Sequence, residues 1–142
     1  MSKIIDGEGK ILGRTATQVA KLLLSGENVT IINAEKMLIS GHAEEITERY
    51  KHKLNLRDKA NPEHSPHISR RPDFFVKRVI RGMLPRKQAR GRDALKRLTV
   101  YMGSPAALKG SEEHKIDVKD PISIYERVIT IGELSSRLGY KE

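Results

Sequence analysis

Cationic side chains are the residues of this sequence with the clearest capacity to bind a ligand. The 142-residue chain has 27 Lys and Arg against 18 Asp and Glu, a formal net charge of +9. Eleven of the cations but only two of the acids fall between Arg70 and Arg97, so the rest of the chain holds sixteen of each. A segment with this much like charge needs an anionic partner, and a phosphate backbone is the usual one. The alternative is a solvated basic face that serves solubility.

The mode of nucleic-acid binding is narrowed by what the sequence lacks. It has two Phe, four Tyr and no Trp, so aromatic platforms for single-stranded bases are scarce. It contains neither a GXXG loop nor an RNP1-like aromatic string, which argues against KH and RRM modules. The remaining mode of nucleic-acid binding is a surface of cationic side chains on helices. Such a surface recognises backbone shape and phosphate position rather than base sequence. A-form RNA is the natural ligand for that mode.

A glycine-containing turn near the N-terminus offers a second kind of chemistry. Gly7, Gly9 and Gly13 lie between a predicted strand and a predicted helix, and Glu35 follows the second strand, as in a dinucleotide-binding unit. The spacing is G-x-G-x-x-x-G rather than the six-residue fingerprint, so a tight turn that brings the helix close to the sheet is the favoured interpretation. A small nucleotide-binding enzyme that uses this turn is the alternative function.

Metal binding and catalysis have little support in the sequence. His64 and His67 stand at a chelating interval beside Glu63, but the chain has no cysteine and no third clustered ligand, whereas zinc takes three or four. A position near phosphate is the preferred interpretation of these histidines. P-loop, HExxH and GxSxG motifs are absent. We therefore expect no enzymatic activity, no cofactor, no metal and no small-molecule substrate.

The first third of the chain is predicted to form a β-α-β unit. A short strand is expected over residues 3–6 and a helix after it, which Gly26 ends. Residues 29–33 (VTIIN) are β-branched and nearly all apolar, which is typical of a parallel strand with helices on both sides of its sheet. The apolar face of the helix is predicted to contain Leu12, Ala16, Val19, Ala20 and Leu23.

The basic segment is predicted to be helical, with an apolar side and a cationic side. A helix over residues 44–58 and a loop over residues 60–70 precede it, and Pro72 suits the first position of a new helix that Pro85 ends. Phe75, Val79, Ile80 and Met83 are expected to face inward, and Lys77, Arg78 and Arg81 outward. Leu84 stays open, because it could pack on the domain or on a neighbouring protein.

The remaining elements complete a single domain over residues 1–142. A short helix around residues 93–97 leads into a strand over residues 98–102, and the Thr130 to Glu133 spacing of a capping box opens a last helix that ends at Gly139. The predicted fold class is α/β: a three-layer domain with a basic helical insertion, about 70–97, before the last strand, and a C-terminal tail, about 106–142.

The expected cellular location follows from the lack of cysteine and of long apolar runs in the sequence. The lack of cysteine permits a reducing compartment. No apolar run reaches the length of a signal peptide or a membrane-spanning helix. We expect a soluble, cytoplasmic protein without a membrane partner.

A series of motifs along the chain resembles those of a known family. DGEGKILGRTAT near the start, INAE and ISG, then RRP and RGMLP, and finally LTVYMG stand in the order found in the L13 family of large-subunit ribosomal proteins. The resemblance spans residues 5 to about 105. RGMLP followed by a glycine-bearing basic run and a VYxG strand is the specific combination. The RKQARG run and a tail that ends in IGELSSRLG resemble archaeal members, whereas the long C-terminal extension typical of eukaryotic members is missing.

The resemblance implies a structural, non-enzymatic ribosomal protein that contacts large-subunit rRNA and neighbouring ribosomal proteins and takes part in early subunit assembly. It also implies a mainly parallel four-stranded sheet between helical layers. A free RNA chaperone with the same surface is a further possibility. No motif of the tail carries over. By matching positions, rRNA contact is transferred to Arg14, Arg70, Arg71, Arg81, Arg86, Lys87 and Arg92. The concentration of charge adds Lys77, Arg78, Arg90, Lys96 and Arg97 to the predicted rRNA-binding residues.

Overall fold

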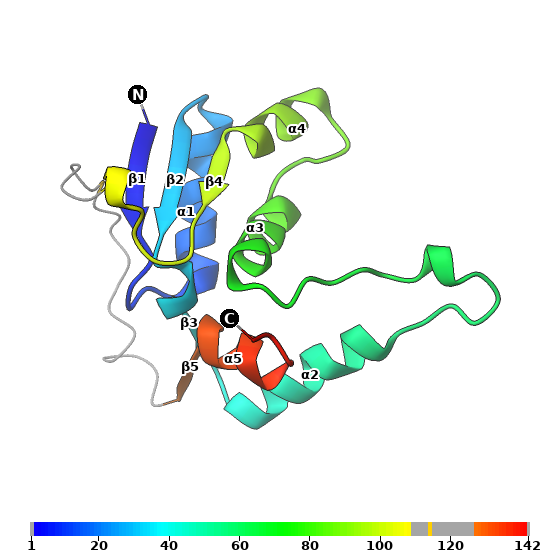
Figure 1. The fold of residues 1–142 in the computed structure, drawn as a ribbon. Coiled ribbons are helices and arrows are strands. Elements are labelled where there is room, and N and C mark those ends of the chain that lie inside the picture. Colours follow the sequence, from blue (N-terminus) through cyan, green and yellow to red (C-terminus); the bar gives the residue numbers. More distant parts are fainter. Residues whose placement is uncertain (1, 109–113, 115–126, 142) are drawn as a thin grey trace.

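The computed structural model describes residues 2–108, 114 and 127–141 (Figure 1). Much of the predicted tail, namely residues 109–113, 115–126 and 142, lies outside the described residues. The strands are β1 (Ser2–Asp6), β2 (Asn28–Ile32), β3 (Leu38–Ser40), β4 (Leu98–Val100) and β5 (Val128–Thr130). The α-helices are α1 (Leu12–Leu24), α2 (Ala43–Asn55), α3 (Pro72–Met83), α4 (Ala89–Lys96) and α5 (Ile131–Arg137). Short 3-10 helices are η1 (Ala34–Lys36), η2 (Pro62–His64) and η3 (Ala106–Leu108).

The main sheet has three parallel strands in the order β1-β2-β4. The prediction of an α/β fold with a parallel sheet is confirmed, but the expectation of four strands in that sheet is wrong. β3 instead pairs antiparallel with β5, which adds a strand that was not predicted. The cause lies after β2, where Asn33 takes the left-handed conformation (φ 53°) and η1 turns the chain away from the direction of the sheet. An isolated parallel bridge joins Leu38 of β3 to Ile11, the residue before α1.

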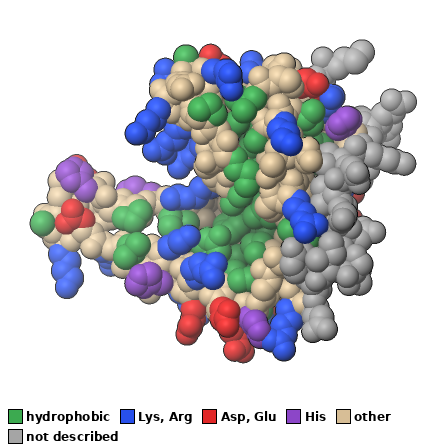
Figure 2. All heavy atoms as spheres, turned by 180° about the vertical axis from the view of Figure 1, so that it is seen from behind, with side chains coloured by type: hydrophobic (Ala, Val, Ile, Leu, Met, Phe, Trp, Pro, Cys, Tyr) green, Lys and Arg blue, Asp and Glu red, His purple; other side chains and the backbone are tan. Residues whose placement is uncertain are grey.

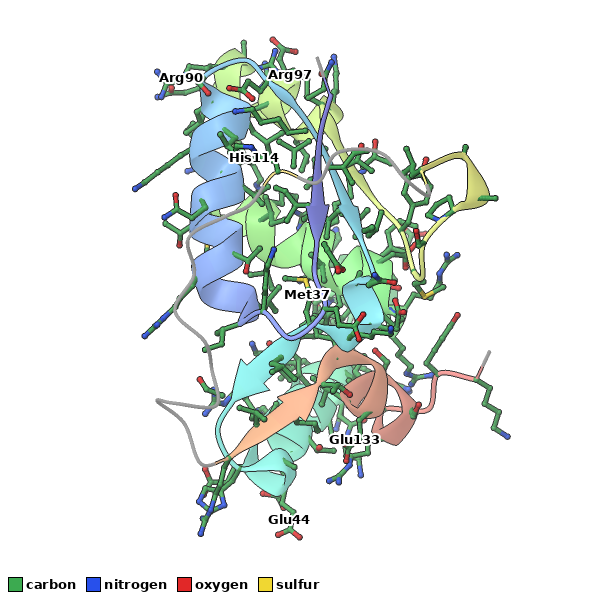
Figure 3. The ribbon with its side chains drawn as sticks, turned by 90° about the vertical axis from the view of Figure 1, so that its left-hand side faces the viewer. Met37, Glu44, Arg90, Arg97, His114 and Glu133 are labelled. Carbon is green, nitrogen blue, oxygen red and sulfur yellow. The ribbon has the colours of Figure 1, made fainter. Side chains whose placement is uncertain are left out.

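The described helices cover the main sheet unevenly. α1 lies against one face, and α3 packs beside α1 and against β4 (Figures 1 and 3). The opposite face carries residues 101–108 with η3 in place of a helical layer. The expected helices on both sides of the sheet are therefore not seen among the described residues. No described helix combines the length and the apolar character needed to cross a membrane.

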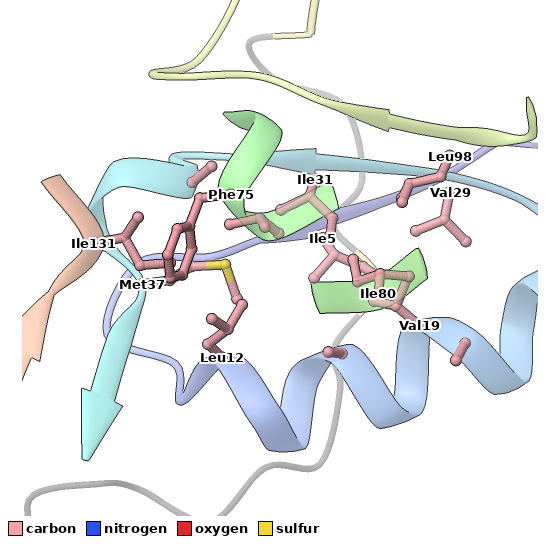
Figure 4. Close-up of a cluster of buried hydrophobic side chains, with 14 of the residues drawn as sticks. Ile5, Leu12, Val19, Val29, Ile31, Met37, Phe75, Ile80, Leu98 and Ile131 are labelled. Carbon is pink, nitrogen blue, oxygen red and sulfur yellow. The ribbon is translucent and has the colours of Figure 1, made fainter. Parts of the chain in front are cut away.

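The hydrophobic core lies between the sheet, α1 and α3 (Figure 4). Ile5, Val29, Ile31 and Leu98 point into it from the strands, and all are fully buried or nearly so. The predicted apolar face of α1 is confirmed, since Leu12, Ala16, Val19, Ala20 and Leu23 are all buried. Each buried aliphatic side chain of this size contributes about 1.5–3 kcal/mol to stability. This core gives α3 a fixed support.

The end of α3 differs from the prediction in one position. Met83 is 41% exposed, so its assignment to the inward face is wrong, whereas Leu84 is 6% exposed and belongs to the core. Leu84 follows the last helical residue and has extended backbone (φ −98°, ψ 147°), which turns its side chain inward. Val76, which was not among the predicted inward residues, is completely buried, as is Ile80. The open question about Leu84 is answered in favour of packing on the domain.

Other predicted boundaries hold within a few residues. Pro72 is the first residue of α3, as predicted. The Thr130 hydroxyl accepts a hydrogen bond from the Glu133 backbone N–H at 3.1 Å, and Gly139 has a positive φ of 99° after α5, which confirms both ends of the last helix. α2 ends at Asn55 rather than at residue 58, and α4 begins at Ala89 rather than near residue 93.

Candidate nucleic-acid interface

Two adjoining hollows bring together five of the predicted rRNA-binding residues. The first lies beside α3 and is lined by His67, Ser69, Phe74, Lys77, Arg78, Arg81 and Leu95. The second adjoins it and is lined by Arg78, Arg81, Gly82, Leu84, Arg86 and Lys87. We call this surface the cationic groove; its cations are Lys77, Arg78, Arg81, Arg86 and Lys87. Among the described residues, no Asp or Glu lines either hollow.

The groove follows from the two sides of α3. Phe75, Val76 and Ile80 anchor the helix in the core, while Lys77 and Arg81, four residues apart, line the groove on its other side. Lys77 and Arg81 are half-buried, so their aliphatic stems lie against the protein. In the view from behind, Lys and Arg side chains gather over the α4 region and at the root of a projecting arm, with hydrophobic side chains between them (Figure 2). The helix therefore holds its cations in place before any ligand arrives.

The turn between α3 and α4, residues 84–88, is fixed by backbone contacts, and we call it the basic elbow. The Gln88 N–H donates to the Pro85 carbonyl at 3.0 Å, and the Arg86 N–H donates to the Leu84 carbonyl at 2.8 Å. α4 packs so closely on this turn that a Cβ at Gly91 would stand 2.2 Å from the Pro85 carbonyl oxygen. The glycine is thus a requirement of the packing, and it fixes the backbone that carries Arg86 and Lys87.

Several predicted cations also make contacts within the protein. Arg92 donates to the Lys87 carbonyl at 3.2 Å, which braces the elbow, and Arg78 donates to the His67 carbonyl at 3.0 Å. Lys96 pairs with Asp93 at 3.5 Å. These bonds fix the side chains or lower the charge that they present. Arg78 thus both lines the groove and bonds to its wall, whereas Arg92 and Lys96 do not line either hollow.

The other predicted cations lie outside the groove. Arg97 is half-buried and donates to the Leu23 carbonyl at the end of α1 at 3.2 Å, which supports a structural role. Arg14 lies half-buried on α1, and Arg70 and Arg90 are exposed. Arg71 pairs with Asp73 at 2.9 Å at the start of α3.

The two ends of the described structure carry different charged residues. Arg90 and Arg97 lie at one end, whereas Glu44 and Glu133 lie at the other (Figure 3). The hollow between α2 and α5 at the second end contains Glu44 and Glu48 beside Lys51 and Arg137, so its charges are balanced.

A projecting arm forms one wall of the groove, and sequence reasoning predicted it only as a loop. The arm, residues 56–71, extends from the body and carries η2 (Figure 1). The Asp58 carboxylate accepts from the Ala60 and Asn61 N–H groups at 3.0 and 3.2 Å, and the Asp58 N–H donates to the Ser65 hydroxyl at 2.9 Å. Asx turns are a usual role of Asp in such segments. The arm thus has local order of its own.

The root of the arm is anchored by an aromatic contact. Tyr50 of α2 lies against Phe75 of α3, with ring centroids 5.0 Å apart and planes inclined by 59°. Burial raises the pKa of the Tyr50 hydroxyl, although the nearby Arg49 and Arg78 act in the opposite direction. The hydroxyl therefore stays neutral at physiological pH, and the contact holds α2 and α3 together where the arm begins.

Atoms of the protein itself fill the space beside the glycine turn near the N-terminus. A Cβ at Gly7 would stand 2.7 Å from the Met37 side chain and 3.0 Å from the Ile32 carbonyl, so the glycine serves close packing. The Glu35 carboxylate accepts from the Gly103 N–H at 2.9 Å. Lys36 donates to Glu8 at 2.9 Å, and this bond raises the pKa of Lys36. Glu35 and Lys36, the polar side chains that follow the second strand, thus both have partners within the protein.

The loop histidines are placed apart from any cluster of metal ligands. In the described part of the chain, no three His, Cys, Asp or Glu side chains gather closely enough to hold a metal ion. His64 lies 3.3 Å from the Asn61 amide on the arm, and His67 lines the first hollow beside the cations of α3. This second placement suits the interpretation of His67 as a residue near phosphate.

Comparison with known proteins shows which family the chain belongs to. Residues 1–107 match the family model described as Ribosomal protein L13. The chain belongs to the ribosomal protein L13 family. Its L13 relatives include the large ribosomal subunit protein uL13 of Archaeoglobus fulgidus, 42% identical over 97% of this chain and 88% of the relative. The uL13 proteins of Methanosphaera stadtmanae (43% identical, 99% of each chain) and Methanosarcina barkeri (45%, 97% and 98%) are similar along their whole lengths.

These findings confirm the resemblance to the L13 family that the motifs indicated. The matched region ends just after the LTVYMG segment and contains the groove, the elbow and the arm. The three L13 relatives are archaeal, as the RKQARG run and the end of the tail predicted.

Proposed function

We propose that this L13 family protein is a structural constituent of the large ribosomal subunit, and that the whole chain acts as one rRNA-binding domain. Its partners in this proposal are large-subunit rRNA and the ribosomal proteins beside it, in the cytoplasm. The protein has no catalytic role here and supports early assembly of the subunit. The observation that carries the proposal is the cationic groove, where five Lys and Arg, and no carboxylate of the described part of the chain, line two adjoining hollows.

The groove favours RNA for reasons of charge and of rigidity. Guanidinium groups match phosphate oxygens in a two-pronged geometry, and arginines fixed in advance lose less conformational entropy on binding. The core beneath α3 and the contact between Gly91 and Pro85 supply this fixation. Each bound phosphate also releases condensed counterions from the RNA, which provides much of the binding free energy.

The salt dependence of rRNA binding tests the proposal. The five groove cations together with the exposed Arg70, Arg90 and Arg92 make eight candidate phosphate contacts. For eight contacts, the slope of log affinity against log salt concentration is expected to be roughly −6 to −7. Filter binding with large-subunit rRNA measures it, and a slope near zero would contradict the proposal.

A role as a free RNA chaperone would use the same surface and is separated by a different measurement. A structural constituent cosediments with large subunits after a high-salt wash, because it is surrounded by rRNA and other proteins. A chaperone that binds only during folding is released by that wash. We expect the protein to remain with the subunit.

A further inference from the structure

An exposed aromatic ring stands among the cations of the first hollow. Phe74 of α3 is 49% exposed, whereas its neighbour Phe75 is 5% exposed and packs in the core. Phe74 lines the hollow together with Leu95, Lys77, Arg78 and other residues. An aromatic ring in this place combines a flat apolar surface with several positive charges.

The surroundings of the ring are ordered by contacts on both sides. The Arg71 guanidinium lies 5.1 Å from the centroid of the Phe74 ring and is held there by its ion pair with Asp73 at 2.9 Å. In the same hollow, the bond from Arg78 to the His67 carbonyl fixes the wall that the arm provides. The ring therefore keeps its position in the free protein, which lowers the entropic cost of stacking on it.

We infer that this hollow binds one unpaired nucleotide of rRNA, whose base stacks on Phe74 while its phosphate contacts Lys77, Arg78 or Arg81. The inference rests on the proposed function and names what the groove recognises. A base within a duplex is covered on both faces by its neighbours, so only a bulged or looped-out base can reach the ring. The volume of about 290 Å³ lies near the roughly 300 Å³ lower end of small-ligand pockets, which suits a single nucleotide rather than a helix.

A protein partner fits the hollow less well. An apolar side chain of a neighbouring protein that covered Phe74 would bury Lys77, Arg78 and Arg81 without providing an anion for them. A nucleotide provides both a flat base that can stack on the ring and a negative phosphate that can pair with the cations.

Two RNA hairpins with the same stem test this inference. One is fully paired and the other carries a single-nucleotide bulge, and both are titrated with the full-length protein and with Phe74→Leu. Leucine keeps an apolar side chain but removes the aromatic face. We expect the wild type to prefer the bulged hairpin, and Phe74→Leu to bind it roughly 5- to 150-fold more weakly, the range that base stacking provides. Affinity for the paired hairpin should stay unchanged.

Control variants keep the result interpretable. Phe74→Trp retains a stacking surface and should retain the preference for the bulged hairpin. Tyr101→Leu alters another aromatic residue of similar exposure, 41%, that does not line the hollow, and should bind like the wild type. Because Phe74 is half exposed, Phe74→Leu should melt within about 2 °C of the wild type.

The outcomes separate the inference from the function on which it rests. Equal binding of the bulged hairpin by the wild type and Phe74→Leu, with a steep salt dependence in both, overturns the nucleotide pocket and leaves rRNA binding in place. Phe74 would then be assigned to a contact with a protein neighbour. Failure of the wild type to bind either hairpin, or large-subunit rRNA, would contradict the proposed function itself.

Discussion

Gly91→Ala is expected to lower the free energy of unfolding by about 3 kcal/mol. The new methyl group would stand 2.2 Å from the Pro85 carbonyl oxygen and 2.5 Å from its carbon, and both of these atoms belong to the backbone. Because backbone cannot rotate away as a flexible side chain can, α4 must move off the elbow. Overpacking of this kind costs about 1–3 kcal/mol, and occasionally more. For a chain of this size, the melting temperature should fall by roughly 10 °C.

Gly82→Ala is the matched control for this substitution. Gly82 also lies in the basic segment and in a helix, but no atom of the described residues lies within 4 Å of a Cβ built there. Alanine favours the helix, so Gly82→Ala should leave stability unchanged or raise it by about 0.5 kcal/mol. Urea unfolding of both variants measures the two free energies of unfolding. Equal stability of the two would mean that α4 does not pack on the elbow as described.

The double substitution Arg81→Gln with Lys87→Gln is expected to weaken binding to large-subunit rRNA about 100-fold. Both side chains line the second hollow, and each would contact phosphate. A hydrogen bond to a charged group contributes roughly 1.5–3 kcal/mol, so two lost contacts amount to about 3 kcal/mol or more. The slope of log affinity against log salt should become shallower by roughly 1.5–2. Stability should change little, because neither residue belongs to the core cluster.

The control for the charge itself is Lys51→Gln with Lys141→Gln. Both residues are exposed, and Lys51 lies beside Glu44 and Glu48 on α2. This variant also loses two positive charges, but both lie outside the groove. It should bind rRNA within about threefold of the wild type. If the two double variants weaken binding equally, net charge rather than the groove determines affinity.

The sequence predicted most elements whose cause is local. α1, the start of α3 and the cap of α5 were all found by periodicity, by Pro72 and by Thr130, and each depends on residues within a few positions. Met83 and Leu84 show where this reasoning failed. A helical repeat extended to residue 83 places Met83 inward. The proline at residue 85, however, disfavours helical backbone at Leu84, so the chain leaves the helix there and Leu84 enters the core instead.

Features that depend on distant residues were not predicted. β3 has three residues and pairs with β5 across about 90 positions, so neither strand carries a signal in its own segment. The shape of the groove also depends on the arm, whose histidine carbonyl meets Arg78, and on the close contact between Gly91 and Pro85. The charge map assigned RNA contact to residues 70–97, and this assignment stays a prediction. It could not separate Arg81, which lines the groove, from Arg97, which bonds to α1.

The groove and the elbow are proposed to be the surface that contacts rRNA. Cross-linking of the protein to rRNA within purified large subunits, followed by mass spectrometry of the linked peptides, tests this proposal most directly. We predict that the linked residues concentrate in residues 67–92, with the strongest links at the groove cations. Links confined to α2 and α5, at the end that carries Glu44 and Glu133, would contradict the account.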